Sequence, residues 1–317
     1  MNGRSAHETC NVGCQSTKPS LYEEVRGLLR NWSLELTPRE TEKLGTAVRE
    51  HLPAGTRVYV TWLAGSDFDA SVSAAARLRV AGLEPVPHLA ARAIRDESTL
   101  VDMLVRLRGE ADVKQALVIG GAVAEPKGPF AASIQLLNSG LLERHGIRRL
   151  GVAVHPEGSP DVPPGALEEA LALKNEYAAR TGAEVELTTQ FCFDAVPITR
   201  WERQVRATGN RLPVVVGLAG LAGITTLVKH ARNCGVGNSI SVLLKQATNM
   251  FRLATAVDPS EVLLGLAQAR HADAETAISR VHFFPFGAFE ATARYARALA
   301  EGRFEIVGSE RRIVVNR

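Results

Sequence analysis

Apolar and polar positions follow a regular alternation along most of the chain. After residue 30, short β-rich runs alternate with segments that have helical periodicity. The predicted strands are residues 32–37, 57–63, 84–90, 115–121, 149–155, 184–193, 212–220 and 281–286. No G-x-G-x-x-G motif follows the first of them, which weakens a doubly wound dinucleotide fold. The alternation therefore predicts an α/β protein with a single (β/α)8 TIM barrel.

The helices between these strands are amphipathic. The helix predicted over residues 96–108 has its leucines on one face, and Gly109 is placed to cap its end. Another is predicted over residues 167–180 and is ended by Gly182. The span 238–279 has a mostly helical pattern and no convincing strand. We therefore expect extra helices before the last strand.

No low-complexity linker divides the chain, so one domain is expected. Residues 1–30 are predicted to be a flexible leader plus a first helix, residues 31–303 the catalytic barrel, and residues 304–317 a C-terminal extension with a small strand pair. The charge-free run 212–228 is interrupted by glycines. A buried strand, a loop and a helix explain it better than a membrane span.

Composition and charge narrow the function. Of 317 residues, 45% are hydrophobic and 22% are charged, which is typical of a globular protein, and the net charge of +3 gives no strong attraction to nucleic acid or membranes. The four cysteines make no dense disulfide framework, which favours the reducing cytoplasm. Cys10 and Cys14 with His7 fall short of a four-ligand zinc site, so no metal is expected.

A carboxylate stands inside the first predicted strand. Leu34 and Leu36 flank Glu35. The two-residue period of a strand predicts that the leucines face the helices and that Ser33, Glu35 and Thr37 face the inside of the barrel. Because burying an unpaired carboxylate is costly, an inward glutamate needs a role. By itself, Glu35 is equally well explained as a catalytic group or as a buried ion-pair partner.

Further polar residues lie at the carboxyl ends of other strands, where barrel enzymes place their chemistry. They are Thr61, His88, His155, Gln190 and Asp194. In the sixth strand, alternation places Thr188, Gln190, Cys192 and Asp194 opposite Leu187, Phe191 and Phe193. These polar side chains are expected to converge on the barrel mouth.

Some of these residues also have structural explanations. Thr37, Pro38 and Glu40 have the spacing of a capped helix start. His88 alone is better explained as a core histidine. The glycine-rich loop 120–128 would suit an unrelated barrel enzyme acting on phosphorylated substrates, although such loops are weak signals.

Several stretches in the same order resemble the methylenetetrahydrofolate reductase family. They are "SLELTPRETEKL", "VYVTW", "EPVPHLAAR", "GVAVHPEGSP", "TTQFCFD" and "VHFFPF". The resemblance covers residues 31–302 and implies a TIM barrel. It also implies reduction of 5,10-methylenetetrahydrofolate to 5-methyltetrahydrofolate by a reduced nicotinamide, normally through bound FAD.

The resemblance assigns roles to residues that match the family's motifs. Glu35 corresponds to the catalytic acid, and Thr61 to the threonine near the pterin. Gln190 corresponds to the glutamine that contacts folate, and Phe193 and Asp194 complete that motif. A small-molecule folate is therefore the expected partner, and the oligomeric state is not predicted.

The residues that would meet a cofactor depart from the family. His88 corresponds to the flavin-side histidine, but Gly120 and Gly121 stand where the family has an Arg-Gly-Asp motif. Other departures are Phe130 for a tyrosine, His155 and Ser159 for a tyrosine and a histidine, Glu176 for a phosphate-binding lysine, and Ala288 for an arginine that meets the folate glutamate. Because a pyrophosphate needs cations or helix N-termini, these changes argue against tight FAD binding.

The leading expectation is a flavin-independent member that uses NAD(P)H directly. NADH is slightly favoured, although no recognisable ribose-binding motif distinguishes NADH from NADPH. Two alternatives remain open. One is an FAD-dependent reductase with rearranged flavin contacts, and the other is a redox-inactive protein that delivers folate to a methyltransferase.

Overall fold

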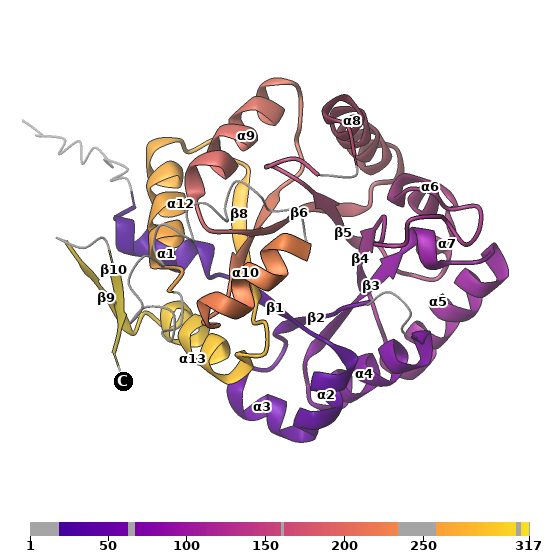
Figure 1. Ribbon diagram of the computed structural model, residues 1–317, viewed down its shortest axis with the longest axis horizontal. Coiled ribbons are helices and arrows are strands. Elements are labelled where there is room, and N and C mark those ends of the chain that lie inside the picture. The colour runs from indigo at the N-terminus through magenta and orange to yellow at the C-terminus, as the bar shows by residue number, and fades with distance from the viewer. Residues whose placement is uncertain (1–18, 63–66, 160–161, 234–257, 309–311, 317) are drawn as a thin grey trace, which may run out of the picture.

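The computed structural model describes residues 19–62, 67–159, 162–233, 258–308 and 312–316 (Figure 1). Strands β1 to β8 pair in parallel in sequence order, and β8 pairs with β1 to close the barrel. The predicted (β/α)8 barrel is confirmed. The leader with Cys10 and Cys14 lies outside the described residues, as do residues 238–257 of the predicted helical span.

Every predicted strand is present. The strands are β1 (Ser33–Leu36), β2 (Arg57–Val60), β3 (Glu84–Ala90), β4 (Gln115–Ile119), β5 (Arg149–Val154), β6 (Glu184–Cys192), β7 (Val214–Ala219) and β8 (Ile278–Phe284). The last strand begins three residues earlier than predicted. Its first residue, Ile278, pairs with Val214 of β7.

The helices surround the strands (Figure 1). They are α1 (Leu21–Leu28), α2 (Pro38–Leu44), α3 (Val48–His51), α4 (Phe68–Val80), α5 (Glu97–Ala111), α6 (Ser133–Asn138), α7 (Leu141–Arg144), α8 (Pro164–Thr181), α9 (Ala195–Ala207), α10 (Ile224–Asn233), α12 (Ser260–Ala272) and α13 (Phe289–Ala300). Short 3-10 turns occupy Gly45–Ala47 and Ala91–Ala93. Both α10 and α12 lie between β7 and β8, which agrees with the predicted extra helices.

One helix end was predicted wrongly. Helix α5 does not stop at Gly109 but continues to Ala111, and Asp112 takes the left-handed cap conformation with φ 44°. The extra turn buries Ala111, and Arg108 then donates to Asp112 Oδ1 and to the carbonyl of Val113. By contrast, α8 ends at Gly182, as predicted.

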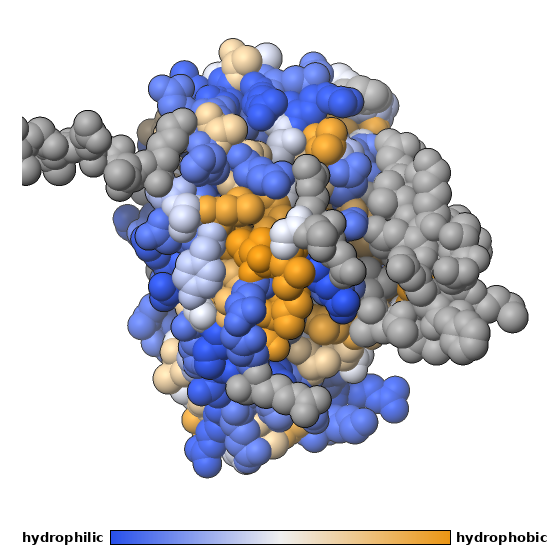
Figure 2. Space-filling view, turned by 90° about the vertical axis from the view of Figure 1, so that its left-hand side faces the viewer, coloured by the Kyte–Doolittle hydropathy of each residue, from blue (hydrophilic) through white to orange (hydrophobic). Residues whose placement is uncertain are grey.

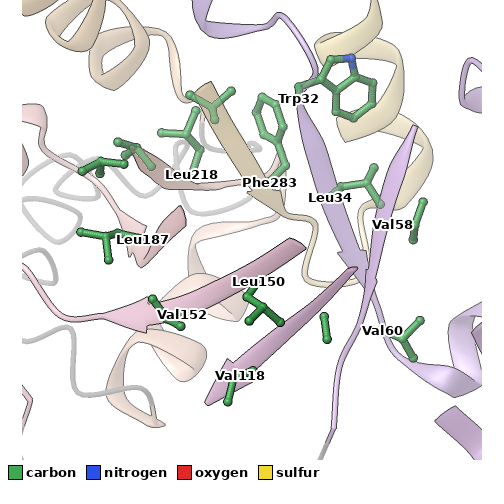
Figure 3. Close-up of a cluster of buried hydrophobic side chains, with 14 of the residues drawn as sticks. Trp32, Leu34, Val58, Val60, Val118, Leu150, Val152, Leu187, Leu218 and Phe283 are labelled. Atoms are coloured by element: carbon green, nitrogen blue, oxygen red, sulfur yellow. The ribbon is translucent and has the colours of Figure 1, made fainter. Parts of the chain in front are cut away.

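The main core lies between the strands and the helices. Leu34, Val58, Val118, Leu187 and Phe283 all contribute to it, and Figure 3 shows these side chains around the outside of the strands. Inside the barrel, Tyr59, Val86 and Leu117 form a smaller buried cluster. The alternation predicted for the first strand is therefore confirmed at its centre: Leu34 packs in the core and Glu35 lines the interior cavity, while Leu36 at the strand end belongs to the core and also lines the cavity.

A capped helix start follows β1 directly. The Thr37 hydroxyl accepts from the backbone N–H of Glu40, and the Glu40 carboxylate accepts from the Thr37 backbone N–H. Pro38 occupies the first helical position. This reciprocal cap fixes where the chain leaves the barrel immediately after Glu35.

The two ends of the described chain lie on one side of the barrel. Strands β9 (Phe304–Val307) and β10 (Arg312–Val315) pair antiparallel, as the C-terminal pattern predicts. Figure 2 views this side and shows an apolar strip between hydrophilic borders. No helix in the described part has the length and apolar content needed to cross a bilayer. The run 212–228 forms β7, a loop and the start of α10, as expected.

Candidate active site at the barrel mouth

A cavity of about 640 Å³ opens at the carboxyl ends of the strands. Residues from β1, β3, β4, β5, β6 and β8 line it, and His230 of α10 contributes from above. Figure 1 shows α10 crossing in front of the barrel. The volume falls in the range usual for small-molecule sites.

Glu35 stands in the wall of this cavity with a side chain that is 16% exposed. Burial and, to a smaller extent, the nearby Glu40 carboxylate together raise the pKa of its carboxyl to about 8. Glu35 is therefore mainly protonated at neutral pH, and it can act as a proton donor.

Two imidazoles face the same oxygen of Glu35. His282 Nε2 lies 3.7 Å from Glu35 Oε2, and His88 Nε2 lies 3.9 Å from it. Burial lowers the pKa of His88 to about 4. The pKa of His282 is also well below its ordinary value, because of burial and then because of the Arg280 guanidinium. Both rings are therefore neutral at pH 7, and neither forms a true ion pair with Glu35.

A polar network lies below these residues, toward the amino ends of the strands. Arg280 makes an ion pair with Glu186 and donates to the Ser33 hydroxyl at 2.8 Å. The Tyr59 hydroxyl donates to the Glu186 carboxylate at 3.2 Å, and Gln115 donates to it at the same distance. This buried network holds the floor of the site in a fixed arrangement.

Strand β6 carries a bulge where it meets the cavity. Its register against β7 shifts between Thr188 and Phe191, which inserts one extra residue. Thr189 fills the gap, because its hydroxyl accepts the backbone N–H of Gly217. Thr188, Gln190 and Phe191 consequently all line the cavity.

The bulge overturns the alternation predicted beyond Gln190. Phe191 faces the cavity, although it was predicted on the opposite side. Cys192 packs in the main core and donates its S–H to the Gly217 carbonyl. Asp194 caps helix α9, where its carboxylate accepts the backbone N–H of Val196, and Phe193 packs edge-on against Phe191.

Aromatic rings form one wall of the mouth. Phe191 and Phe284 have ring centroids 5.5 Å apart, and Phe286 stacks on His230 at 4.5 Å. Phe286 has a φ of 49°, a conformation that is strained for an aromatic residue. The strained turn brings its ring into the cavity wall. Sheet and helix thus present flat apolar surfaces suited to a planar ring.

The other predicted residues separate into two groups. Thr61, His88, His155 and Gln190 line the cavity with Glu35. The lining residues do not include Gly120, Gly121, Phe193 or Asp194. Gly121 instead allows β3 and β4 to approach closely: it has φ 94°, and a Cβ there would lie 3.1 Å from that of Ala90.

Polar atoms in the cavity wall lack partners. Among the described residues, Thr61 Oγ1, Thr188 Oγ1 and His88 Nε2 are buried and make no hydrogen bond. Since buried polar groups normally find partners, these atoms are available to a polar ligand. Lys174 lies close by, where its ammonium donates to the Ala153 carbonyl at 2.8 Å, and burial lowers its pKa to about 8.

Sequence reasoning missed His282 and Thr188 as site residues. A signal existed for His282, because the two-residue period of "RVHFFPF" places Arg280, His282 and Phe284 on one face. Thr188 was placed on the inward face but received no role. His230 gave no such signal, since its position depends on how α10 crosses the mouth.

The fold and cavity define a (β/α)8-barrel enzyme with a protonated acid at the carboxyl ends of its strands. The sequence matches the methylenetetrahydrofolate reductase family over residues 30–293, and the chain belongs to that family. At family level it is an oxidoreductase-type enzyme of folate chemistry. The resemblance inferred from the motifs is confirmed, and an unrelated barrel enzyme is excluded.

One solved structure agrees on the fold, and a second has a lower TM-score. A GH18 chitinase from Pseudoalteromonas aurantia is similar with a TM-score of 0.51 and 12% identity, over 86% of this chain and 98% of its own. A putative lyase/mutase from Burkholderia cenocepacia J2315 has a TM-score of 0.47 and 14% identity, over 89% and 88%. At such identities the chitinase shows the barrel fold alone, and the second score supports no further argument.

Proposed function

We propose that this protein interconverts 5,10-methylenetetrahydrofolate and 5-methyltetrahydrofolate with NAD(P)H by direct hydride transfer, without bound FAD. The observation that carries the proposal is a protonated carboxyl, Glu35, beside two neutral imidazoles in the cavity of a chain from this family. NADH is the first reductant to test. Cytoplasmic location remains a prediction.

The reaction needs an acid. The C1 unit of methylenetetrahydrofolate bridges N5 and N10 in a five-membered ring. A proton delivered to N10 breaks the bond between that nitrogen and the bridging carbon, and leaves an iminium cation at N5. Glu35 is the group proposed to deliver this proton, because its pKa of about 8 keeps it protonated at neutral pH. Reduced nicotinamide then supplies a hydride, with its electron pair, to the iminium carbon.

Binding of the pterin is assigned to the polar part of the wall. Gln190 Oε1 accepts the backbone N–H of Phe191 at 3.1 Å, which orients the amide so that its NH₂ group remains for a ligand. Thr61 Oγ1 supplies a buried hydroxyl without a partner. Phe193 and Asp194, which the family motif also assigned to folate, are proposed to act indirectly by fixing the bulge and the start of α9.

Flat rings are assigned to the aromatic part of the wall. Phe191, Phe284 and Phe286 offer faces against which the aminobenzoate of folate or a nicotinamide can stack. His155 lines the same cavity, and the resemblance would place a cofactor beside it. A reduced nicotinamide bound beside His155 would therefore share one cavity with Glu35.

The positions that the family resemblance assigns to the FAD diphosphate argue against tight binding of that cofactor. The end of β4 supplies Gly120, Gly121 and Ala122, none of which carries charge. Glu176 is exposed on α8 where the family resemblance expects a lysine, and the nearby Lys174 is turned inward onto the Ala153 carbonyl. These residues do not provide the cations that would hold the pyrophosphate of a resident cofactor tightly, whereas a nicotinamide dinucleotide that binds and leaves in each turnover does not need to be retained in this way. No step of the proposed reaction therefore passes through a flavin.

Family membership favours the alternative of an FAD-dependent reductase, since members normally hold that cofactor. The visible absorbance of the purified protein distinguishes the two, because bound flavin is yellow. We expect a colourless protein that oxidises NADH or NADPH with methylenetetrahydrofolate. A flavin spectrum with activity would support the FAD-dependent alternative, and tight folate binding without nicotinamide oxidation would support a redox-inactive folate carrier.

The acid itself is tested with Glu35→Gln. We expect at least a 100-fold loss of kcat with an unchanged fold, because general acid catalysis contributes about 10² to 10⁴ in rate. Glu176→Gln, on the exposed face of α8, is the matched control and should keep wild-type turnover. Near-normal turnover of a folded Glu35→Gln variant would refute the proposed role.

A further inference from the structure

A chain of buried polar contacts reaches Glu35 from below. Arg280 Nη1 donates to Ser33 Oγ at 2.8 Å, and Ser33 Oγ lies 2.9 Å from His282 Nδ1. His282 Nε2 then faces Glu35 Oε2 at 3.7 Å. Ser33 is 0% exposed, His282 1% and Arg280 5%, so water does not compete for these contacts.

The direction of each hydrogen bond follows from the donors available. A guanidinium can only donate, so Ser33 Oγ accepts from Arg280. Among the described residues, the hydroxyl's other hydrogen-bond contact is His282 Nδ1. If Nδ1 carried the proton, the buried hydroxyl hydrogen would have no acceptor, which is costly. Ser33 therefore donates to Nδ1, and neutral His282 carries its hydrogen on Nε2.

We infer that His282 is a positioning residue that presents its Nε2–H to Glu35 Oε2, so that the transferable proton resides on Oε1. This inference rests on the proposed function and adds a residue to its mechanism. The 3.7 Å separation is longer than a hydrogen bond. Catalytic hydrogen bonds are often long in a free enzyme and shorten in the substrate complex.

The contact changes strength during the proposed reaction. An N–H donates more strongly to a carboxylate than to a neutral carboxyl group. As Glu35 gives up its proton, the bond from His282 therefore strengthens, which stabilises the transition state more than the ground state. Removing the donor should slow proton transfer and raise the pKa of Glu35, because the charged form loses a partner.

Charged and titratable groups on several neighbouring elements act on this pair. Among the described residues they include Glu40 of α2, Arg57 and Tyr59 of β2, His88 of β3 and Arg280 of β8. Arg57 and Arg280 oppose a second proton on His282, and so they keep it a neutral donor. His88 Nε2 makes no hydrogen bond, whereas His282 Nδ1 contacts the Ser33 hydroxyl. The serine contact therefore defines the tautomer of His282.

The tautomer can be read without an activity assay. Nitrogen NMR of protein that carries isotope-labelled histidine distinguishes Nε2–H from Nδ1–H imidazoles. The signals of residue 282 are identified as those that disappear in the His282→Gln variant. We expect the Nε2–H form in the wild type and a mixture of tautomers in Ser33→Ala. Ser279→Ala is the matched control, because that hydroxyl donates to the Val214 carbonyl away from Glu35. A wild-type Nδ1–H signal would overturn the inference.

Kinetics test the consequence for catalysis. With methylenetetrahydrofolate, His282→Leu should lose roughly tenfold or more in kcat with little change in KM, and its activity should persist to higher pH than in the wild type. His282→Gln keeps an N–H donor and should recover most of the rate. Ser33→Ala should show a smaller loss of kcat and a smaller shift of the pH dependence in the same direction. This variant replaces His282→Leu in the test if the leucine variant does not fold. Wild-type kcat and pH dependence in both His282→Leu and Ser33→Ala would contradict the inference.

Failure of the two proposals would be distinguishable. If the wild-type protein shows no turnover of methylenetetrahydrofolate with either nicotinamide, the proposed function fails. The nitrogen NMR measurement still decides whether Ser33 fixes the His282 tautomer. If turnover is normal and the tautomer is Nδ1–H, only the positioning role is wrong.

Discussion

The unusual ionisation of Glu35 should be measurable as a change in stability with pH. Its pKa is about 8 in the folded protein, against an ordinary value of 4.5. Between these values the folded state binds a proton that the unfolded state has released. The free energy of unfolding therefore falls as pH rises through this window. Glu35→Gln removes the ionisation while nearly preserving side-chain shape, so the variant should gain stability relative to the wild type as pH increases.

The magnitude follows from the separation of the two pKa values. One pH unit corresponds to about 1.4 kcal/mol, so a separation of roughly 3.5 units limits the effect to about 5 kcal/mol. Most of the change falls between pH 5 and pH 8, where the advantage of the variant should grow by about 3 kcal/mol. The depressed pKa values of His88 and His282 lower the stability of both proteins below about pH 6.5, within part of this range, and this shared effect cancels in the difference between them.

Urea unfolding at several pH values between 5 and 8 measures this difference directly. Glu176→Gln, which changes an exposed glutamate, should follow the wild type at every pH. If the stability difference between Glu35→Gln and the wild type is constant from pH 5 to pH 8, Glu35 ionises normally in the folded protein. The argument for a protonated acid would then be wrong.

Other substitutions test the framework that holds the site. Arg280→Leu should cost about 1–3 kcal/mol in urea unfolding, because it removes one charged partner of Glu186 and leaves Arg57 at 3.8 Å with the Tyr59 and Gln115 hydrogen bonds, and adding Glu186→Leu should recover part of that loss. Thr37→Ala should cost about 1 kcal/mol in the same assay, since it removes the cap of α2. Gly217→Ala would place a Cβ 2.7 Å from the backbone oxygen of Gln190, so we expect a loss of about 1–3 kcal/mol and weaker folate binding by calorimetry. An unchanged stability in any of these variants would refute the corresponding contact.

The barrel could be predicted because its signals are local. Each strand has its own apolar run, and each βα connection carries its own turn chemistry, such as the capping box of Thr37 and Glu40. The inward direction of Glu35 follows from period two over a short regular strand. The end of α5 was wrong by three residues, because the burial of Ala111 outweighed the preference for glycine at the cap.

Strand β6 shows where local reasoning fails. A bulge inserts one residue between Thr188 and Phe191, and the side chains of Phe191 and Cys192 lie on the opposite faces from those predicted. The bulge is stabilised by a hydrogen bond in which the Thr189 hydroxyl accepts the backbone N–H of Gly217 in β7. Because this contact involves a different strand, no periodicity within β6 reveals it. For the same reason, Cys192 could not be placed in the core from its own segment.

The partners of Glu35 come from distant parts of the chain, and their ionisation explains why burial suits the proposed reaction. Transfer of the proton to folate N10 would create a carboxylate on Glu35 and a cation on the substrate within one cavity. Protonated histidines beside Glu35 would repel that cation and would favour an ionised Glu35 before substrate binds. Neutral His88 and His282 do neither, yet an N–H on His282 can still stabilise the carboxylate once it forms. The same desolvation that keeps the acid protonated therefore keeps both imidazoles neutral, so a single physical cause prepares all three groups for the proposed chemistry.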